Sequence, residues 1–201
     1  MYYYIYIYDI IQKMEVWFMK KVLKALPAIA PVPVVLVSCG NMEESNISTI
    51  AWTGIICSDP VMIYISIRPN RYSSEIIKKS GEFVINLPSE NQVKETDYCG
   101  TKSGRDIDKF RECNFTKVIS SNIEVPYIKE CPINIECKLK EIKNLGSHDM
   151  FIAEVLSVNC DEDLLDENGN ILYEKANLIS FAGKKYFYSN KEVGYRGICL
   201  I

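Results

Sequence analysis

Residues 61 to 88 read VMIYISIRPNRYSSEIIKKSGEFVINLP and contain a strand, a helix and a second strand in succession. In Val61 to Ile67 alternate residues share a face, and both faces are largely apolar, so we expect a strand inside a sheet rather than at its edge. Ser73 is expected to cap the start of a short helix, and Gly81 to end it. Phe83 to Leu87 predicts the next strand.

The rest of the chain repeats short apolar or alternating runs separated by turn residues. This pattern predicts a mainly β domain with a few short helices rather than a helical bundle. A polar loop at residues 40 to 45 joins the first two runs as a hairpin. The further strands expected are Val34 to Cys39, Ile47 to Thr53, Ile133 to Ile142 and Met150 to Val158, and the helical segments are Glu90 to Cys99 and Ile107 to Arg111.

The chain has 201 residues, 48% of them hydrophobic and 24% charged, which is the size and composition of one globular domain. Residues 1 to 18 are rich in Tyr and Ile and are interpreted as an N-terminal extension. Met19 is a second candidate start, so we assign the domain to residues 19 to 201. The net charge of −3 and the scattered basic residues argue against a nucleic-acid partner.

Two features near the N-terminus imitate membrane or export segments. Residues 1 to 18 carry charges and are too short to span a bilayer, and residues 25 to 42 are uncharged but contain three helix-breaking prolines. Lys20-Lys21, an apolar stretch and Cys39 imitate a secretory signal that ends at a lipid-accepting cysteine. We expect instead a cytoplasmic protein with no membrane partner.

The eight cysteines and the single histidine, His148, show no metal-ligand spacing, so no metal site is expected. We expect the cysteines to be reduced and mostly buried as small hydrophobic residues. One histidine also leaves no Ser-His-Asp or Cys-His site in a familiar sequence context. The motifs G-x-x-x-x-G-K-[ST] and G-x-G-x-x-G are both missing, so a nucleotide would have to be bound in another way.

Two polar loops combine basic residues with serine: SIRPNRYS, Ser66 to Ser73, and SGRDIDKF, Ser103 to Phe110. Arginine donates forked, charge-assisted hydrogen bonds to phosphate, and serine hydroxyls add short ones. Free N–H groups at the start of the helix after the first loop also favour an anion. Exposed Arg-rich turns are, however, often solvated or paired with carboxylates, so the residues alone leave both interpretations open.

Six segments, in order, resemble the flavin reductase-like, FMN-binding split-barrel proteins and, within them, the branch that contains flavoredoxin. The resemblance runs from about Lys21 to the C-terminus, and residues 1 to 18 fall outside it. The segments are NISTIAWTG (46–54), SIRPNRYS (66–73), GEFVINLP (81–88), DYCG (97–100), SGRDIDKF (103–110), and LGSH (145–148) leading into MFIAEV (150–155).

The resemblance implies an antiparallel Greek-key split β-barrel that forms a homodimer, with FMN in a cleft at or near the subunit interface. An apolar, flat wall with donors nearby suits the flavin ring. Trp52 is alternatively an ordinary core residue. The implied cofactor-binding residues are Thr49, Ala51, Trp52 and Thr53 along the ring, Arg68, Arg71, Tyr72 and Ser73 at the phosphate with help from Lys109, and Ser66.

His148 is the candidate catalytic residue, near the flavin or the dimer contact, where it would bind a nicotinamide or handle protons. The alternative is a structural histidine at a hairpin. The expected function is an oxidoreductase that passes electrons from NAD(P)H through FMN to a flavin, iron or protein acceptor. The other candidate is a flavoredoxin-like electron carrier that keeps its FMN and oxidises no nucleotide itself. A barrel that has lost its cofactor is disfavoured, because the basic and aromatic loop residues are intact.

Overall fold

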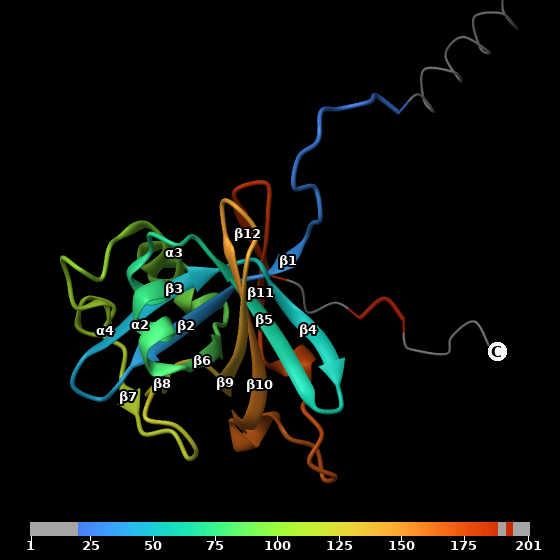
Figure 1. Cartoon of the computed structure of the whole chain (residues 1–201). Coiled ribbons are helices and arrows are strands. Elements are labelled where there is room, and N and C mark those ends of the chain that lie inside the picture. The colour runs from blue at the N-terminus through green and yellow to red at the C-terminus, as the bar shows by residue number, and fades with distance from the viewer. Residues whose placement is uncertain (1–19, 189–191, 195–201) are drawn as a thin grey trace, which may run out of the picture.

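A computed structural model of the chain describes residues 20 to 188 and 192 to 194 (Figure 1). The expected N-terminal extension, Met19 and Cys199 lie outside the described residues. The helices are α2 Tyr72–Ser80, α3 Val93–Thr101 and α4 Lys109–Glu112, with 3₁₀ turns η1 Glu90–Gln92, η2 Glu162–Leu164 and η3 Tyr173–Lys175. The strands are β1 Val32–Pro33, β2 Val35–Gly40, β3 Ser45–Ile50, β4 Thr53–Ser58, β5 Val61–Ile67, β6 Glu82–Leu87, β7 Lys117–Val118, β8 Tyr127–Ile128, β9 Ile133–Asn144, β10 Asp149–Cys160, β11 Ile179–Ala182 and β12 Lys185–Tyr188.

The main sheet has the strand order β3-β2-β6-β9-β10-β5-β4, and every neighbouring pair is antiparallel. Its two edge strands, β3 and β4, follow one another in the chain and are separated only by Ala51 and Trp52. The sheet must therefore curl until its two edges come close at this connection. Ser66 N of β5 donates to Trp52 O at 2.9 Å, which extends the pairing of β4 with β5 into the connection. This confirms the predicted antiparallel split-barrel fold.

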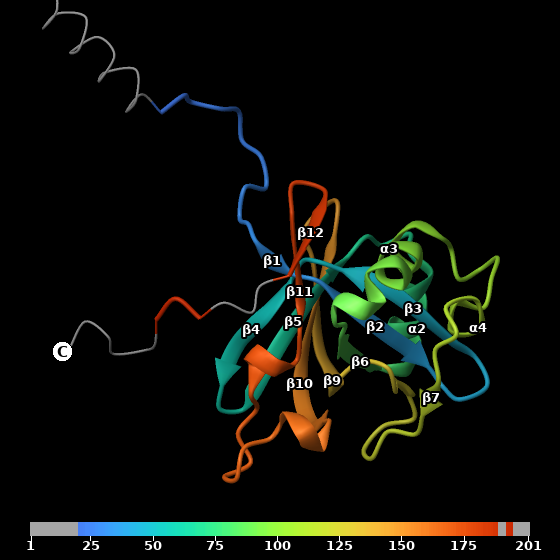
Figure 2. The same ribbon diagram turned by 180° about the vertical axis from the view of Figure 1, so that it is seen from behind.

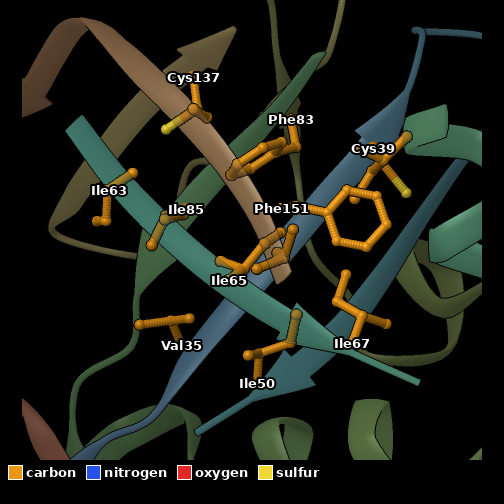
Figure 3. Packing of buried hydrophobic residues seen from close by; sticks show 13 residues of the cluster. Val35, Cys39, Ile50, Ile63, Ile65, Ile67, Phe83, Ile85, Cys137 and Phe151 are labelled. Carbon is orange, nitrogen blue, oxygen red and sulfur yellow. The ribbon is translucent and has the colours of Figure 1, made fainter. Parts of the chain in front are cut away.

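The inward faces of the strands fill the barrel with apolar side chains (Figure 3). Val35, Val37 and Cys39 alternate along β2, and they pack in one cluster with Phe83 and Phe151. Burial of one such Val or Phe side chain contributes about 1.5–3 kcal/mol. Because the residues of this cluster come from strands far apart in the sequence, the core forms only when the sheet closes.

The helices α3 and α4 cover the outer face of β2 and β3. Leu36 and Ile47 point away from the barrel interior and form a second buried cluster with Cys99 of α3 and Phe110 of α4. Strands β2 and β3 are therefore buried on both faces. Figures 1 and 2 show the helices beside these strands, on the opposite side of the molecule from β4.

The described cysteines are free thiols, and Cys39, Cys99, Cys131 and Cys137 are buried. All four belong to apolar clusters of the two layers. Burial raises the pKa of the Cys39 thiol to about 12. The interpretation of these cysteines as small hydrophobic residues is confirmed.

The proline-containing run from residue 25 to 42 contains no helix. The first part of this run lies apart from the barrel and leads into β1 and then β2 (Figure 2). Across residues 20 to 188 and 192 to 194, no helix is long and apolar enough to cross a membrane.

Helix α2 confirms one predicted boundary and corrects the other. Gly81 ends the helix with φ 71° and donates its N–H to Ile77 O at 2.8 Å, as the sequence predicts. The N-cap residue is Arg71, however, and its side chain makes no capping hydrogen bond. The prediction that Ser73 caps the helix is wrong, because its hydroxyl is bound by Asn46 Nδ2 at 2.8 Å and Ser48 Oγ at 2.7 Å.

The strand boundaries differ most at the seam. The sequence predicts one strand to Thr53, but β3 ends at Ile50 and Thr53 begins β4, where it pairs with Ile65. The register of β4 shifts between Ile55 and Cys57, and this bulge breaks the alternation that would reveal the strand. Strand β5 pairs with β4 on one side and β10 on the other, which confirms that it is internal.

One carboxylate is buried within the sheet and pairs with no cation of the described residues. Glu136 of β9 is 0% exposed, and its oxygens accept hydrogen bonds from Ser121 N, Asn122 N and the side-chain amides of Asn122 and Asn159. Burial by itself raises the pKa of Glu136, but these hydrogen bonds together outweigh it and hold the pKa below its ordinary value. The carboxylate thereby anchors the loop at residues 121 and 122 to the sheet.

We expect Glu136→Gln to lower the free energy of unfolding at pH 7 by about 1–3 kcal/mol, because an amide group would face buried donors. The native pKa lies below the unfolded value of about 4.3, so the carboxylate's contribution is complete above that value and is lost as the pH falls through the native pKa. Urea titrations at pH 7 and at acid pH measure this. Glu141→Gln, at an exposed site of the same strand, is the control, and equal stability of Glu136→Gln and the wild type would contradict the prediction.

Candidate functional site

Two adjoining cavities lie at the seam of the barrel, beside the end of β5. The first has a volume of about 190 Å³, and the second about 380 Å³. Both are lined by Ser48, Arg68 and Arg71, so they adjoin at these residues, and together they are called the cleft. The cleft therefore begins at the connection between β3 and β4 and ends at the polar loop that precedes α4.

The first cavity has an aromatic wall. Thr49 lines it from β3, Ala51 and Trp52 line it from the connection between the edge strands, and His148 lines it from the turn between β9 and β10. The ring centroids of Trp52 and His148 lie 4.6 Å apart at an angle of 40°. Trp52 is 44% exposed, which rules out the alternative that it is a core residue. The closed seam thus holds an indole face open toward the cavity.

The imidazole of His148 lies where a charge would be costly. Ser147 Oγ and His148 Nδ1 are 2.9 Å apart, which fixes one side of the ring. Partial burial lowers the pKa of His148, and the positive charge of Arg68 lowers it further. Both effects favour the neutral form of the ring, in which one nitrogen donates a hydrogen bond and the other accepts one.

The second cavity is lined by basic and polar residues, and no acidic residue of the described chain lines it. Arg68 and Arg71 are exposed, and within the described ranges neither side chain makes an ion pair or a hydrogen bond. Two arginines that pair with no carboxylate of the described chain favour an anionic ligand here. The basic residues lining it are Arg68, Arg71, Lys102, Arg105 and Lys109.

Lys109 forms the floor of this cavity and is only 3% exposed. Its ammonium group donates to Ile47 O and Cys99 O, both at 2.7 Å. Burial lowers its pKa, and the charge of Arg71 adds to the effect. Two of its three donors thus hold α3 and β3 together, and one is left for a ligand.

The structure brings most of the predicted site residues together. Two lie behind the cavity walls: Thr53 donates its hydroxyl to Tyr64 O at 2.6 Å, and Ser73 is buried against Asn46 and Ser48. The predicted residues that line the cleft are Thr49, Ala51, Trp52, Ser66, Arg68, Arg71, Tyr72, Lys109 and His148.

Several lining residues were not predicted, although the sequence contains signals for some of them. Asn46 and Ser48 share one face of β3 by strand periodicity, and both lie in the segment that carries the family resemblance. Arg105 belongs to the polar loop Ser103 to Phe110. Gly104 lies so close to β3 that a Cβ there would stand 2.0 Å from Asn46 Oδ1, and only the fold reveals this contact.

Over residues 28 to 186 the chain matches the family described as "Flavin reductase like domain". The protein belongs to the flavin reductase-like family. The structure of flavoredoxin of Desulfovibrio vulgaris (Miyazaki F) is similar with a TM-score of 0.85 and 32% identity, covering 91% of this chain and 100% of that one. Flavoredoxin from Methanosarcina acetivorans has a TM-score of 0.82 and 25% identity over the same shares. A relative from Streptomyces viridifaciens, named NADPH-flavin oxidoreductase, is 24% identical over 139 residues, 67% of this chain and 69% of its own.

We expect the titration of His148 to have its midpoint below the ordinary histidine value of about 6.5. Arg68→Gln should raise the midpoint, because it removes a positive charge that opposes the imidazolium. Because the chain has one histidine, the ring resonances in proton NMR are unambiguous. Arg111→Gln, on α4 and outside the cleft, serves as the control. A midpoint at or above 6.5, or one that Arg68→Gln leaves unchanged, would contradict the assigned environment.

Proposed function

We propose that the cleft binds FMN and that the protein is an oxidoreductase, passing electrons from NAD(P)H through FMN to a flavin, iron or protein acceptor. The observation that carries the proposal is that two unlike cavities adjoin. Trp52 and His148 line only the first, Lys102 and Lys109 line only the second, and Arg68 and Arg71, which pair with no carboxylate of the described chain, line both. A flavin mononucleotide has the matching parts, a flat apolar ring and a doubly charged phosphate.

The donor set at the second cavity fits a phosphate. Arg68 and Arg71 carry forked donors, and Tyr72 adds a phenol at the start of α2. Arg71 is the N-cap of α2, and its side chain makes no capping hydrogen bond. The cap residue therefore does not compete with a phosphate for the first N–H groups of this helix. These residues would hold the phosphate, with Lys109 beneath them.

The residues of the first cavity fit a flavin ring. The wall consists of the flat indole of Trp52 with the small side chains of Ala51 and Thr49 beside it, which suits a planar ring. Ser66 and Gly100 also line the space. When bound, FMN would supply a ring that accepts hydride from NAD(P)H and releases electrons to an acceptor. His148, neutral and packed on Trp52, would hold a proton at the edge of this cavity.

A flavoredoxin-like electron carrier is the second candidate function. Its support is the similarity to flavoredoxin of Desulfovibrio vulgaris, which extends over the whole of that chain. The carrier would use the same cleft and keep its FMN, but it would not oxidise a nicotinamide nucleotide.

The proposal includes a homodimer formed through the edge strand β4. Ile55 and Ile56 of this strand are 78% and 46% exposed, and Val61 at the start of β5 is 47% exposed. An apolar edge strand of this kind is a site of association in soluble proteins. Because Trp52 immediately precedes β4, a second copy covering this edge would also shield the first cavity from water.

We expect the purified protein to bind FMN, and Arg71→Ala to weaken binding by about 1.5–3 kcal/mol, or roughly tenfold to a hundredfold, through loss of a charge-assisted hydrogen bond. Quenching of flavin fluorescence measures the affinity, and Arg111→Ala is the control of equal charge. A wild type that FMN cannot reconstitute would refute the proposed function. Unchanged affinity of Arg71→Ala would remove Arg71 from the site.

The same reconstituted protein distinguishes the two candidates. Without oxygen, NADH or NADPH should bleach the flavin absorption band if the protein is a reductase. A holoprotein that neither nucleotide bleaches would favour the carrier.

We expect the wild type to be a dimer by light scattering coupled to gel filtration, and Ile55→Asp to be a monomer, because a carboxylate would be desolvated at the apolar edge. Ile119→Asp is the control, since Ile119 is 73% exposed and lies between β7 and β8. A monomeric wild type would contradict the proposed assembly.

A further inference from the structure

A third cavity adjoins the far end of the cleft. It is a groove of about 790 Å³ between the loop joining β2 to β3, helix α2 and the loop before α4. The second and third cavities have Tyr72, Gly104 and Arg105 in common. These three residues therefore lie at the boundary between the proposed phosphate site and the groove.

The side chain of Arg105 is held at this boundary by two contacts with α2. Its Nη1 and Nη2 atoms donate to the two carboxylate oxygens of Glu75 at 3.0 and 2.6 Å. Its guanidinium group also lies 4.8 Å from the centre of the Tyr72 ring. A two-pronged ion pair combined with stacking fixes the plane of the guanidinium group.

The backbone beneath Arg105 is fixed as well. Gly104 lies against Asn46 of β3, where a Cβ would stand 2.0 Å from Asn46 Oδ1. The boundary thus rests on β3 at one side and on α2 at the other, the same two elements that hold the phosphate end of the cleft.

The two sides of the boundary differ in charge. The second cavity is lined by basic residues and by no acidic residue of the described chain. Around the third, carboxylates outnumber the cations Lys79, Lys117 and Arg105, and Glu75 already pairs with Arg105. The carboxylates lining the groove are Glu43, Glu44, Glu75, Asp106, Asp108 and Glu124.

We propose that the Arg105–Glu75 pair, stacked on Tyr72, is a selectivity wall that admits FMN and rejects FAD. The inference rests on the proposed FMN site. FMN ends at its single phosphate, so it would lie entirely within the first and second cavities, on the basic side of Arg105. In this proposal FAD would extend its second phosphate and its adenosine past Arg105 toward the acidic groove, and it would displace the Arg105–Glu75 pair in doing so.

Arg105 as a direct phosphate ligand is the competing explanation, and two variants separate it from a wall. Arg105→Ala removes the guanidinium group, whereas Glu75→Gln keeps it but weakens its anchor. A wall predicts that both variants shift the preference toward FAD. A phosphate ligand predicts that Arg105→Ala weakens FMN and FAD alike, and that Glu75→Gln strengthens both alike.

The test measures dissociation constants of FMN and FAD for each variant by fluorescence quenching. We expect the wild type to prefer FMN. The FMN-to-FAD preference should fall by up to roughly fivefold in both variants, which is the contribution of an exposed ion pair with good geometry. Arg111→Ala controls for the lost cation. Glu43→Gln controls for a carboxylate lost from the groove without contact to Arg105. Both controls should keep the wild-type preference.

The possible outcomes are distinct. A wild type that binds FMN but shows an unchanged preference in Arg105→Ala and Glu75→Gln overturns the wall and leaves the proposed function standing. An equal shift in Glu43→Gln also overturns the wall, because charge alone would then explain the preference. A wild type that binds FAD as tightly as FMN has the same consequence, and one that binds neither flavin refutes the proposed function together with the wall.

Discussion

The connection of Ala51 and Trp52 between the two edge strands of the main sheet is the constraint on which the rest depends. A sheet whose first and last strands are two residues apart has to curl, and the hydrogen bond from Ser66 N to Trp52 O ties this connection to β5. Closure creates the interior that buries Phe83 and Phe151. It also keeps Trp52 out of that interior, so the same constraint produces both the core and the aromatic wall of the cleft.

A buried polar contact couples the barrel to the helix at the phosphate end. The hydroxyl of Ser73 lies between Asn46 and Ser48 of β3, and Ser73 and Asn46 are buried. Because an unpaired buried polar group is costly, the contact sets the position of α2 against β3. Ser73 therefore acts on the site indirectly: it positions the start of the helix and does not cap it.

Local sequence patterns predicted strands whose side chains alternate between two faces and a helix that ends at a glycine. The β5 strand, the end of α2 at Gly81 and the strand β6 are of this kind. They did not predict β4, whose bulge at Ile55 removes the alternation. Local patterns also could not predict the direction of side chains at the site. Thr53 and Ser73 turn toward backbone and buried partners that only the closed sheet supplies. The loop carrying Arg105 was recognised by composition, but its ion pair with Glu75 depends on a contact across 30 positions of the chain.

The chain has a net charge of −3, yet it gathers several positive charges around one cavity. Holding like charges close together costs free energy. Lys109 is buried near Arg71, and burial together with that like charge lowers its pKa, so the positive charges are held together against their repulsion. The carbonyl oxygens of Ile47 and Cys99 offset part of this cost. An anion in the second cavity would offset more, because it would attract every cation that lines it. The ligand that the site favours is thus also one that stabilises the fold, in proportion to its concentration relative to its dissociation constant.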